Sequence, residues 1–230
     1  MPVNLKTLAS FKEELKSFKA ELVAVSKTKP PSDIVEAYNS GQRIFGENYV
    51  QELVDKYESL PKDIEWHFIG HLQGNKVKYI APFVTLIHGV DSLGLLKEMN
   101  KQAVKNNRVI DCLLQIYIAE EETKFGFSYK ECTELLNSKE LLEFKNISIK
   151  GLMGMATLTD NLHQIQKEFH TLSVYFQQLV NEQTQLPTSN SLLTILSMGM
   201  TSDYKIALAA GSNMVRIGSA IFGEREDYKI

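Results

Sequence analysis

The chain has 230 residues, of which 43% are hydrophobic and 23% charged, a composition typical of a globular protein with a sizeable core and not of a disordered one. Its 25 basic and 28 acidic residues give a net charge of −3, which argues against a general nucleic-acid or anionic-membrane surface. Cys112 and Cys132 form no metal-ligand pattern, and no apolar run approaches the ~20 residues of a membrane span, so we expect a cytoplasmic protein without structural disulfides.

Short apolar runs recur along the chain, and segments with helical spacing and polar interruptions lie between them. Residues 1–18 are typical of an amphipathic helix and not of a secretory leader. The predicted strands are 22–26, 43–46, 66–70, 84–90, 109–118, 147–153, 192–199 and 214–218. The predicted helices between them are 32–40, 47–58, 73–81, 92–106, 128–138, 161–183 and 202–210. The polar stretch 181–191 indicates a helix end followed by a loop.

The alternation of strands and helices predicts a parallel sheet, because strands that are apolar on both faces need helices on both sides. Eight such units within 230 residues favour a single (β/α)8 barrel domain, residues 1–230, with an extra N-terminal helix. The alternative is an open doubly wound sheet, which often carries a G-x-G-x-x-G turn after its first strand. The corresponding turn here is SKTKPP, so the barrel is the favoured prediction.

A lysine follows the first predicted strand. Val23, Val25 and Lys27 share one face of that strand, because alternate residues of a strand point the same way. At the end of an isolated strand such a lysine extends its amine into solvent. In a barrel, however, active sites are built at the carboxyl ends of the strands, where low dielectric disfavours the charged amine. A free amine there can form a Schiff base, either with a sugar aldehyde or with pyridoxal phosphate.

The last two predicted strands end in loops of small and polar residues, LSMGMTSD (196–203) and VRIGSAIFG (215–223). Loops after strands 7 and 8 of this barrel often bind phosphate through converging backbone N–H groups. Either loop alone is equally well explained as a plain helix cap. Together they favour a phosphate site, and hence pyridoxal phosphate as the ligand of the lysine.

Arg216 lies inside the apolar run MVRIG, where a guanidinium is costly unless it meets a partner. That partner is either a carboxylate or, if a pyridine ring extends from Lys27 toward strand 8, the ring nitrogen. An arginine is always charged and would keep the ring nitrogen unprotonated. Such a ring is a weak electron sink, so the site would support only limited carbanion chemistry.

Six spaced motifs resemble the pyridoxal phosphate homeostasis protein family, whose members are relatives of the alanine racemase N-terminal domain. They are AVSKTKP, FGENYVQE, WHFIGHLQGNK, GLMGMA, LSMGMTSD and NMVRIGSAIFG, in order from about residue 22 to residue 223. The resemblance implies a barrel that carries pyridoxal phosphate as an aldimine on Lys27. Many relatives have Thr in place of Asn213 and Ser in place of Thr201, and both differences keep a polar side chain.

The resemblance also implies which residues surround the cofactor. It implies that the phosphate is held around Ser197, Gly199, Gly218 and Ser219. By analogy with the racemase domain, Arg216 takes the position opposite the ring nitrogen. Asn48, in the GEN motif after the second strand, is implied to lie near the ring.

We assign no functional site to the remaining patterns. GHLQGNKV (70–77) fails the spacing of a phosphate-binding Walker loop, and His67 and His71 fall on a strand and a loop, not on one helix face, so we expect no metal site. Lys150 lies on the strand where class I aldolases carry their Schiff-base lysine, but without the expected neighbours. The remaining histidines are interpreted as a residue packed at a strand end, His88, and as solvated helix residues, His163 and His170.

Three functions are consistent with a Schiff-base lysine on this barrel. We favour a protein that holds pyridoxal phosphate without substantial catalysis, acts in vitamin B6 homeostasis and passes the cofactor to apo-enzymes. A racemase needs proton carriers on both faces of its substrate, and related racemases take the second one, a Tyr, from another domain; we see no such domain before Ile230. The third function is that of a class I aldolase. We therefore predict no catalytic residues and a monomer.

Overall fold

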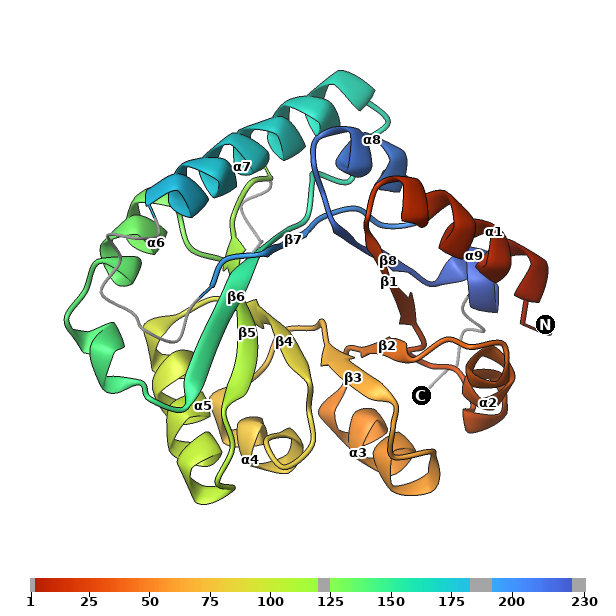
Figure 1. The fold of residues 1–230 in the computed structure, drawn as a ribbon, viewed down its shortest axis with the longest axis horizontal. Helices are drawn as coiled ribbons and strands as arrows, with labels where there is room; N and C mark the ends of the chain where they lie inside the picture. The colour runs from red at the N-terminus through yellow and green to blue at the C-terminus, as the bar shows by residue number, and fades with distance from the viewer. Residues whose placement is uncertain (1–2, 120–124, 183–191, 225–230) are drawn as a thin grey trace.

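Eight parallel strands close into a barrel in the computed structural model, which describes residues 3–119, 125–182 and 192–224. Each strand is hydrogen-bonded to the next in chain order, and β1 pairs with β8 to complete the ring (Figure 1). The strands are β1 (Glu21–Val25), β2 (Ile44–Glu47), β3 (Glu65–Phe68), β4 (Leu86–Val90), β5 (Ile110–Ile116), β6 (Ile147–Gly154), β7 (Ile195–Ser197) and β8 (Met214–Ile217). The predicted (β/α)8 barrel is confirmed.

Helices follow the strands on the outside of the barrel (Figure 1). They are α1 (Leu5–Ser17), α2 (Pro31–Asn39), α3 (Val50–Ser59), α4 (Val77–Ile80), α5 (Leu93–Lys105), α6 (Tyr129–Leu136), α7 (Leu162–Glu182), α8 (Tyr204–Ala209) and α9 (Ser219–Phe222), with 3₁₀ turns η1 (Gly74–Lys76) and η2 (Glu140–Glu143). The predicted helix 73–81 is thus a 3₁₀ turn followed by a single helical turn. Two short elements, η2 and α9, were not predicted, because four residues are too few to show a helical period.

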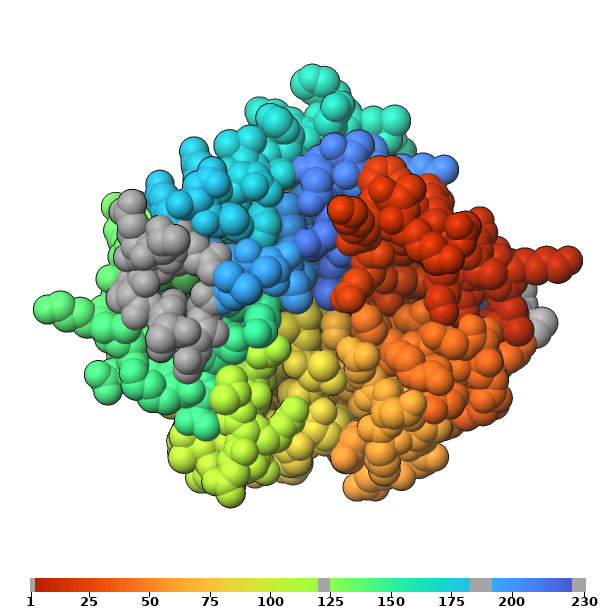
Figure 2. All heavy atoms as spheres, viewed as in Figure 1, coloured from red at the N-terminus to blue at the C-terminus, as the bar shows by residue number. Residues whose placement is uncertain are grey.

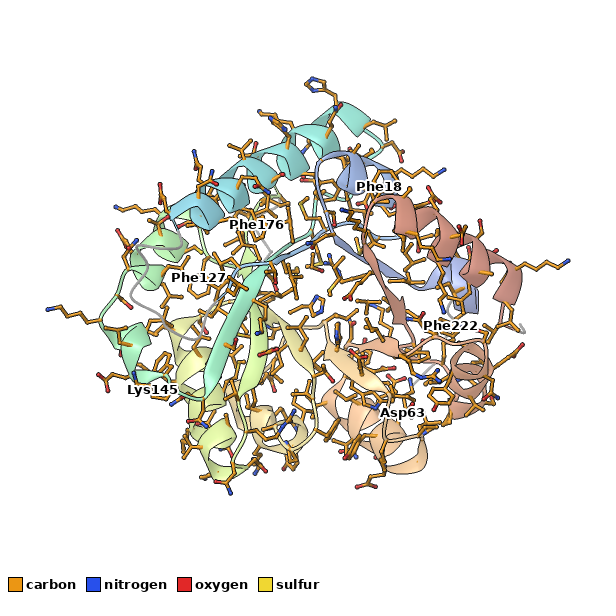
Figure 3. The ribbon with its side chains drawn as sticks, in the orientation of Figure 1. Phe18, Asp63, Phe127, Lys145, Phe176 and Phe222 are labelled. Carbon is orange, nitrogen blue, oxygen red and sulfur yellow. The ribbon has the colours of Figure 1, made fainter. Side chains whose placement is uncertain are left out.

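The side chains of the strands divide into two hydrophobic clusters, one inside the barrel and one between the barrel and its helices. The inner cluster is formed by Val23, Leu86, Leu113, Met153 and Met214. The outer cluster takes the alternate strand residues and the buried faces of the helices; it includes the three phenylalanines labelled in Figure 3 whose rings are buried, Phe127, Phe176 and Phe222. Burial of one such ring stabilises the fold by about 1.5–3 kcal/mol. This alternation aims every second strand residue at the barrel interior.

The extra N-terminal helix joins the two ends of the described chain. Its cap residue Asn4 accepts a hydrogen bond from the Thr7 N–H through Oδ1 (3.0 Å), and the Asn4 N–H donates to the carbonyl oxygen of Ile221 in α9 (2.8 Å). Phe11 meets the ring of Tyr204 edge-on, with 5.3 Å between ring centroids. In Figure 2 the red helix accordingly lies against the blue C-terminal segment. These contacts fix α8 and α9, which carry loops of the site described below.

The seventh strand is shorter than predicted. The sequence predicted residues 192–199, whereas β7 spans only Ile195–Ser197. Gly199 has φ of 93°, a left-handed conformation that ends the strand and turns the chain toward α8. Most of the predicted loop 181–191 lies outside the described residues. Within the described ranges, no helix combines the length and apolar character that a bilayer crossing requires.

Candidate functional site

A cavity of about 440 Å³, which we call the lysine cavity because Lys27 lines it, opens at the carboxyl ends of the strands. Five of the seven residues predicted for the site line it, namely Lys27, Asn48, Arg216, Gly218 and Ser219. The other lining residues are Val25, Lys29, Ile69, Met155, Met200, Thr201, Ser202 and Gly223. The barrel therefore brings together residues from both ends of the sequence, because β1 and β8 are neighbours in the ring.

Lys27 follows β1 at the wall of this cavity. Its neighbour Val25 also lines the cavity, as expected for alternate residues of one strand. Ser26, between them, is fully buried and continues the sheet through its N–H, which donates to the Gly46 carbonyl (3.0 Å). The residue after the lysine, Thr28, has φ of 62°, so the chain turns sharply away from the strand. The lysine thus stands at the last position before the chain leaves the barrel.

Arg216 is held inside the barrel beneath the cavity and is only 4% exposed. One guanidinium nitrogen donates to the carbonyl oxygen (2.9 Å) and the hydroxyl (2.6 Å) of Ser197, and another donates to the carbonyl oxygen of Gly154 (3.0 Å). Burial lowers the pKa of Arg216 to about 10, and the carboxylate of Asp203 opposes that shift. The side chain therefore stays a cation at neutral pH, and its position is set by β6 and β7.

A row of buried polar side chains continues from Arg216 through the barrel interior. His88 Nδ1 lies 3.2 Å from Ser197 Oγ, and His88 Nε2 lies 3.1 Å from His67 Nδ1. Burial lowers the pKa of His67 to about 3; burial also lowers that of His88, with the charges of His67 and Arg216 adding to the effect. Both imidazoles are therefore neutral. His88 was expected at a strand end, but it lies in the middle of β4, where an inward position holds it against Ser197.

The loops after β7 and β8 meet at one end of the cavity. Ser219 Oγ donates to Thr201 Oγ1 (3.3 Å), which joins the two loops directly, and Ser202 also lines the cavity there. Gly218 lies close against β1 and presents bare backbone, because a Cβ atom at this position would come within 3.0 Å of the Val25 carbonyl oxygen. Hydroxyl groups and a bare backbone are a suitable lining for a phosphate.

Ser197 and Gly199, predicted as phosphate contacts, do not appear among the residues that line the cavity. Ser197 is fully buried, and its hydroxyl contacts Arg216 and His88. Gly199 lies behind the loop, where a Cβ atom would come within 2.7 Å of Ala207 Cβ. In the structure these two residues lie next to residues that line the cavity, and their contact with a phosphate stays a prediction.

Asn48 places an amide in the wall of the cavity. Its Oδ1 atom is buried and has no hydrogen-bond partner among the described residues. Gly70 permits this position, because a Cβ atom there would lie 2.6 Å from the Asn48 carbonyl oxygen. A buried acceptor without a partner is costly, and it fits a site that a polar ligand completes.

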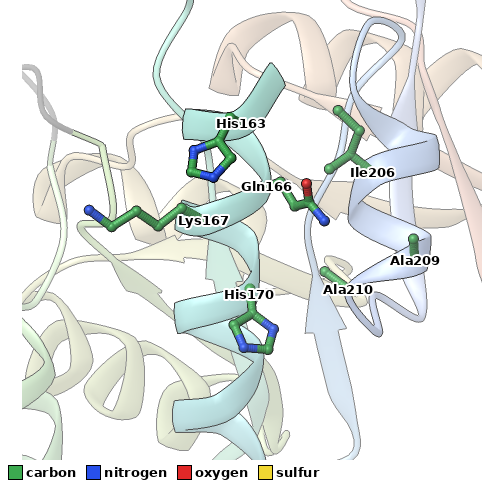
Figure 4. Close-up of a pocket in the computed structure, with 7 residues that line it drawn as sticks. All are labelled: His163, Gln166, Lys167, His170, Ile206, Ala209 and Ala210. Atoms are coloured by element: carbon green, nitrogen blue, oxygen red, sulfur yellow. The ribbon is translucent and has the colours of Figure 1, made fainter. Parts of the chain in front are cut away.

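A second cavity, of about 450 Å³, lies on the outer surface between α7 and α8 (Figure 4). It is lined by His163, Gln166, Lys167, His170, Ile206, Ala209 and Ala210. Both of its histidines are exposed, and it lies away from the strand ends where the barrel concentrates its polar groups. Lys150 is likewise remote from the lysine cavity and pairs with Asp111 (3.7 Å). We therefore take the lysine cavity as the candidate functional site.

Comparisons with known proteins agree with this geometry. Residues 4–226 match the family model of the alanine racemase N-terminal domain. The chain is 42% identical over 208 residues to the pyridoxal phosphate homeostasis protein of Aquifex aeolicus, covering 90% of this chain and 88% of the relative, and 38% identical over 209 residues to that of Escherichia coli, covering 89% and 86%.

Solved structures give the same result. PipY of Synechococcus elongatus without pyridoxal phosphate superposes with a TM-score of 0.86 at 35% identity, and its structure with pyridoxal phosphate bound gives 0.82 at 34%; both comparisons cover 95% of this chain and 99% of PipY. Alanine racemase of Bartonella henselae, 15% identical with a TM-score of 0.67, covers 100% of this chain and 62% of its own and shares the fold. The chain belongs to the pyridoxal phosphate homeostasis protein family, built on the barrel of the alanine racemase N-terminal domain.

Proposed function

We propose that this chain binds pyridoxal phosphate in the lysine cavity, with Lys27 joined to the cofactor's aldehyde as a Schiff base, and that it holds the cofactor as part of vitamin B6 homeostasis. The observation that carries this proposal is the meeting of a strand-end lysine, a buried arginine and two hydroxyl-rich loops in one cavity. The printed names of the relatives and the pyridoxal phosphate bound to PipY support it.

The residues present fit the cofactor group by group. Thr201, Ser202, Gly218 and Ser219 would hold the phosphate, and Arg216 would face the ring nitrogen. Asn48 offers a buried oxygen that still needs a donor. When bound, pyridoxal phosphate supplies an aldehyde for an amine and a ring that withdraws electrons. The cation of Arg216 would leave the ring nitrogen unprotonated, which weakens that withdrawal.

We further propose that the chain holds the cofactor without substantial catalysis. The ionisable side chains that line the cavity within the described residues are Lys27, Lys29 and Arg216, with no carboxylate or imidazole among them. Racemisation requires proton carriers on both faces of the substrate. Lys29 donates to the Glu224 carbonyl (2.8 Å), which draws its amine toward the chain end. The racemase is the alternative that the assay below decides.

The decisive experiment is the absorption spectrum of the full chain with added pyridoxal phosphate, followed by borohydride reduction and peptide mass spectrometry. We expect an imine band, with the reduced adduct on Lys27, and loss of both in Lys27→Ala. Lys150→Ala, at a lysine that pairs with Asp111 and is not among the residues lining the cavity, is the matched control and retains both. A protein that takes up no pyridoxal phosphate, or that carries the adduct on another lysine, refutes the proposal.

Two further measurements address catalysis and delivery. Interconversion of D- and L-alanine above a control without protein would overturn the non-catalytic function in favour of a racemase. We also propose that apo-enzymes accept the cofactor from this chain acting as a monomer, which light scattering checks. Release of pyridoxal phosphate that is no faster with an apo-enzyme than with a passive trap would contradict directed delivery.

A further inference from the structure

A buried polar network from β2 and α3 grips the chain on both sides of Lys27. On the strand side, Ser26 Oγ donates to Glu47 Oε1 (2.6 Å), and Lys56 Nζ donates to the Ser26 carbonyl (2.8 Å). On the loop side, the Thr28 N–H donates to Glu52 Oε1 (2.6 Å). Three hydrogen bonds thus fix the two residues that flank the lysine.

Lys56 joins these contacts into one unit. Its amine is 2.8 Å from Glu47 Oε1 and 2.6 Å from Glu52 Oε1, and its side chain is only 4% exposed. Glu52 and Lys56 are four residues apart in α3, so they lie on the same face of the helix. One cation therefore serves both carboxylates as well as the carbonyl next to the lysine.

The network is a poor way to stabilise the fold alone. Glu47 is fully buried, and burial raises its pKa to about 7 against the opposing effect of Lys56. Its second oxygen, Oε2, has no hydrogen-bond partner among the described residues. Apolar residues of similar volume usually stabilise a protein as well as a buried ion pair does. These buried charges are explained better by the geometry that they impose.

Thr28 shows what that geometry requires. Its φ of 62° is left-handed, a conformation that is unfavourable for a β-branched residue. Strain of this kind persists only where the surroundings enforce it, and it is concentrated at functional sites. Two bonds hold this turn: the Lys29 N–H donates to the Ser26 carbonyl (3.1 Å), and the Thr28 N–H donates to the Glu52 carboxylate (2.6 Å), which is the contact from outside the turn.

We propose that Glu47, Glu52 and Lys56 are positioning residues that hold the backbone of residues 26–28 so that the Lys27 amine is presented to an aldehyde in the cavity. This inference rests on the proposed function, in which Lys27 forms the Schiff base. None of these three residues is among those that line the cavity within the described residues, and their printed hydrogen bonds reach Ser26 and Thr28, on either side of the lysine.

The test is a double-mutant cycle on the full-length protein, read by the rate of imine formation with pyridoxal phosphate and by the equilibrium constant. Glu52→Ala removes the acceptor of the Thr28 N–H. Because a hydrogen bond to a charged group is lost, we expect the rate and the equilibrium constant of imine formation to fall by about tenfold or more. Glu58→Ala, on the exposed side of the same helix, is the control and leaves both values unchanged.

The second arm of the cycle is Thr28→Gly. Glycine adopts positive φ without the cost that threonine bears, so part of the population keeps the required turn even without Glu52. We therefore expect Glu52→Ala to lower the rate and the equilibrium constant of imine formation clearly less in the Thr28→Gly background than in the native chain. Glu52→Gln retains an acceptor oxygen and should recover part of the rate. Circular dichroism confirms that each variant is folded.

The outcomes separate this inference from the proposed function. If the native protein forms no imine on Lys27, the proposed function fails. If it does, and Glu52→Ala matches Glu58→Ala, the positioning role is refuted. Equal losses from Glu52→Ala in the native and Thr28→Gly backgrounds also refute it, since a purely structural role would not depend on residue 28.

Discussion

The buried pair of neutral histidines, His67 and His88, leads to a prediction about acid unfolding. Burial lowers the pKa of His67 to about 3 from its usual 6.5 and lowers that of His88 as well. In the unfolded chain both imidazoles take up protons near their usual pKa, whereas in the native barrel they do not. The stability that they contribute is therefore complete above pH 6.5 and is lost as the pH falls toward the native pKa.

The magnitude for His67 alone follows from the pKa shift. From 6.5 to about 3 the pKa moves by about 3.5 units. Each unit is worth about 1.4 kcal/mol, so the loss approaches about 5 kcal/mol, comparable to the whole stability of many domains. Glu47 has the opposite sign: because its pKa is raised from 4.5 to about 7, it contributes about 3 kcal/mol that is present below pH 4.5 and lost as the pH rises through 7. The histidine effect must therefore be isolated by a variant.

His67→Asn isolates it, because an amide oxygen near the position of Nδ1 can accept from His88 but takes up no proton. Free energies of unfolding are measured in urea at a series of pH values between 4 and 8. We expect the difference between the native protein and the variant to change by about 1.4 kcal/mol per pH unit below 6.5, one proton's worth. His163→Asn, on the exposed face of α7, is the control and runs parallel to the native protein. Parallel curves for His67→Asn would refute the assignment.

Three substitutions test the packing around the cavity. Gly199→Ala forces a side chain onto φ of 93° and to within 2.7 Å of α8, so we expect a loss of about 2–3 kcal/mol in thermal unfolding, whereas Gly94→Ala, with open space in α5, should be neutral or stabilising. Ser197→Ala removes the hydroxyl that joins the buried arginine to a histidine and should cost about 1–3 kcal/mol in urea unfolding. Gly70→Ala displaces the Asn48 backbone. It should reduce the free energy of pyridoxal phosphate binding, measured by titration, by more than it reduces the free energy of unfolding.

The sequence was sufficient to predict the barrel, because its strands are apolar on both faces and alternate with amphipathic helices. It did not predict where β7 begins, since Leu192 and Leu193 extend the apolar run to positions before the residues that pair. The conformation of Gly199 depends on the close approach of α8, which no local pattern records. Short elements such as α9 also depend on tertiary contacts, here with the N-terminal segment at Asn4.

Site residues were predictable when their position in a strand carried the information. Lys27 and Arg216 interrupt or end apolar strands, and both line the cavity. Lys56 was not predicted, because a lysine in an amphipathic helix normally reaches solvent, and its burial arises from contact with Ser26, 30 residues away in the chain. The sequence signal for His67 and His88 is a polar residue inside each of the apolar segments WHF and IHG, and both side chains are buried in the structure.

The direction of the hydrogen bonds in the barrel links the buried histidines to Arg216, which lines the cavity. Arg216 can only donate, so Ser197 Oγ accepts from it and has its own hydrogen available for His88 Nδ1. His88 then carries its proton on Nε2 and donates to His67 Nδ1. A proton added to His88 Nδ1 would turn the hydroxyl hydrogen of Ser197 away from His88 and leave the Ser197 oxygen to accept from both the imidazolium and the guanidinium, two cations in one buried contact. Because burial keeps both imidazoles neutral in the native barrel, acid should destabilise the barrel from pH 6.5 downward, whereas pyridoxal phosphate binding by the native protein should stay constant until the pH approaches the native pKa values of the histidines.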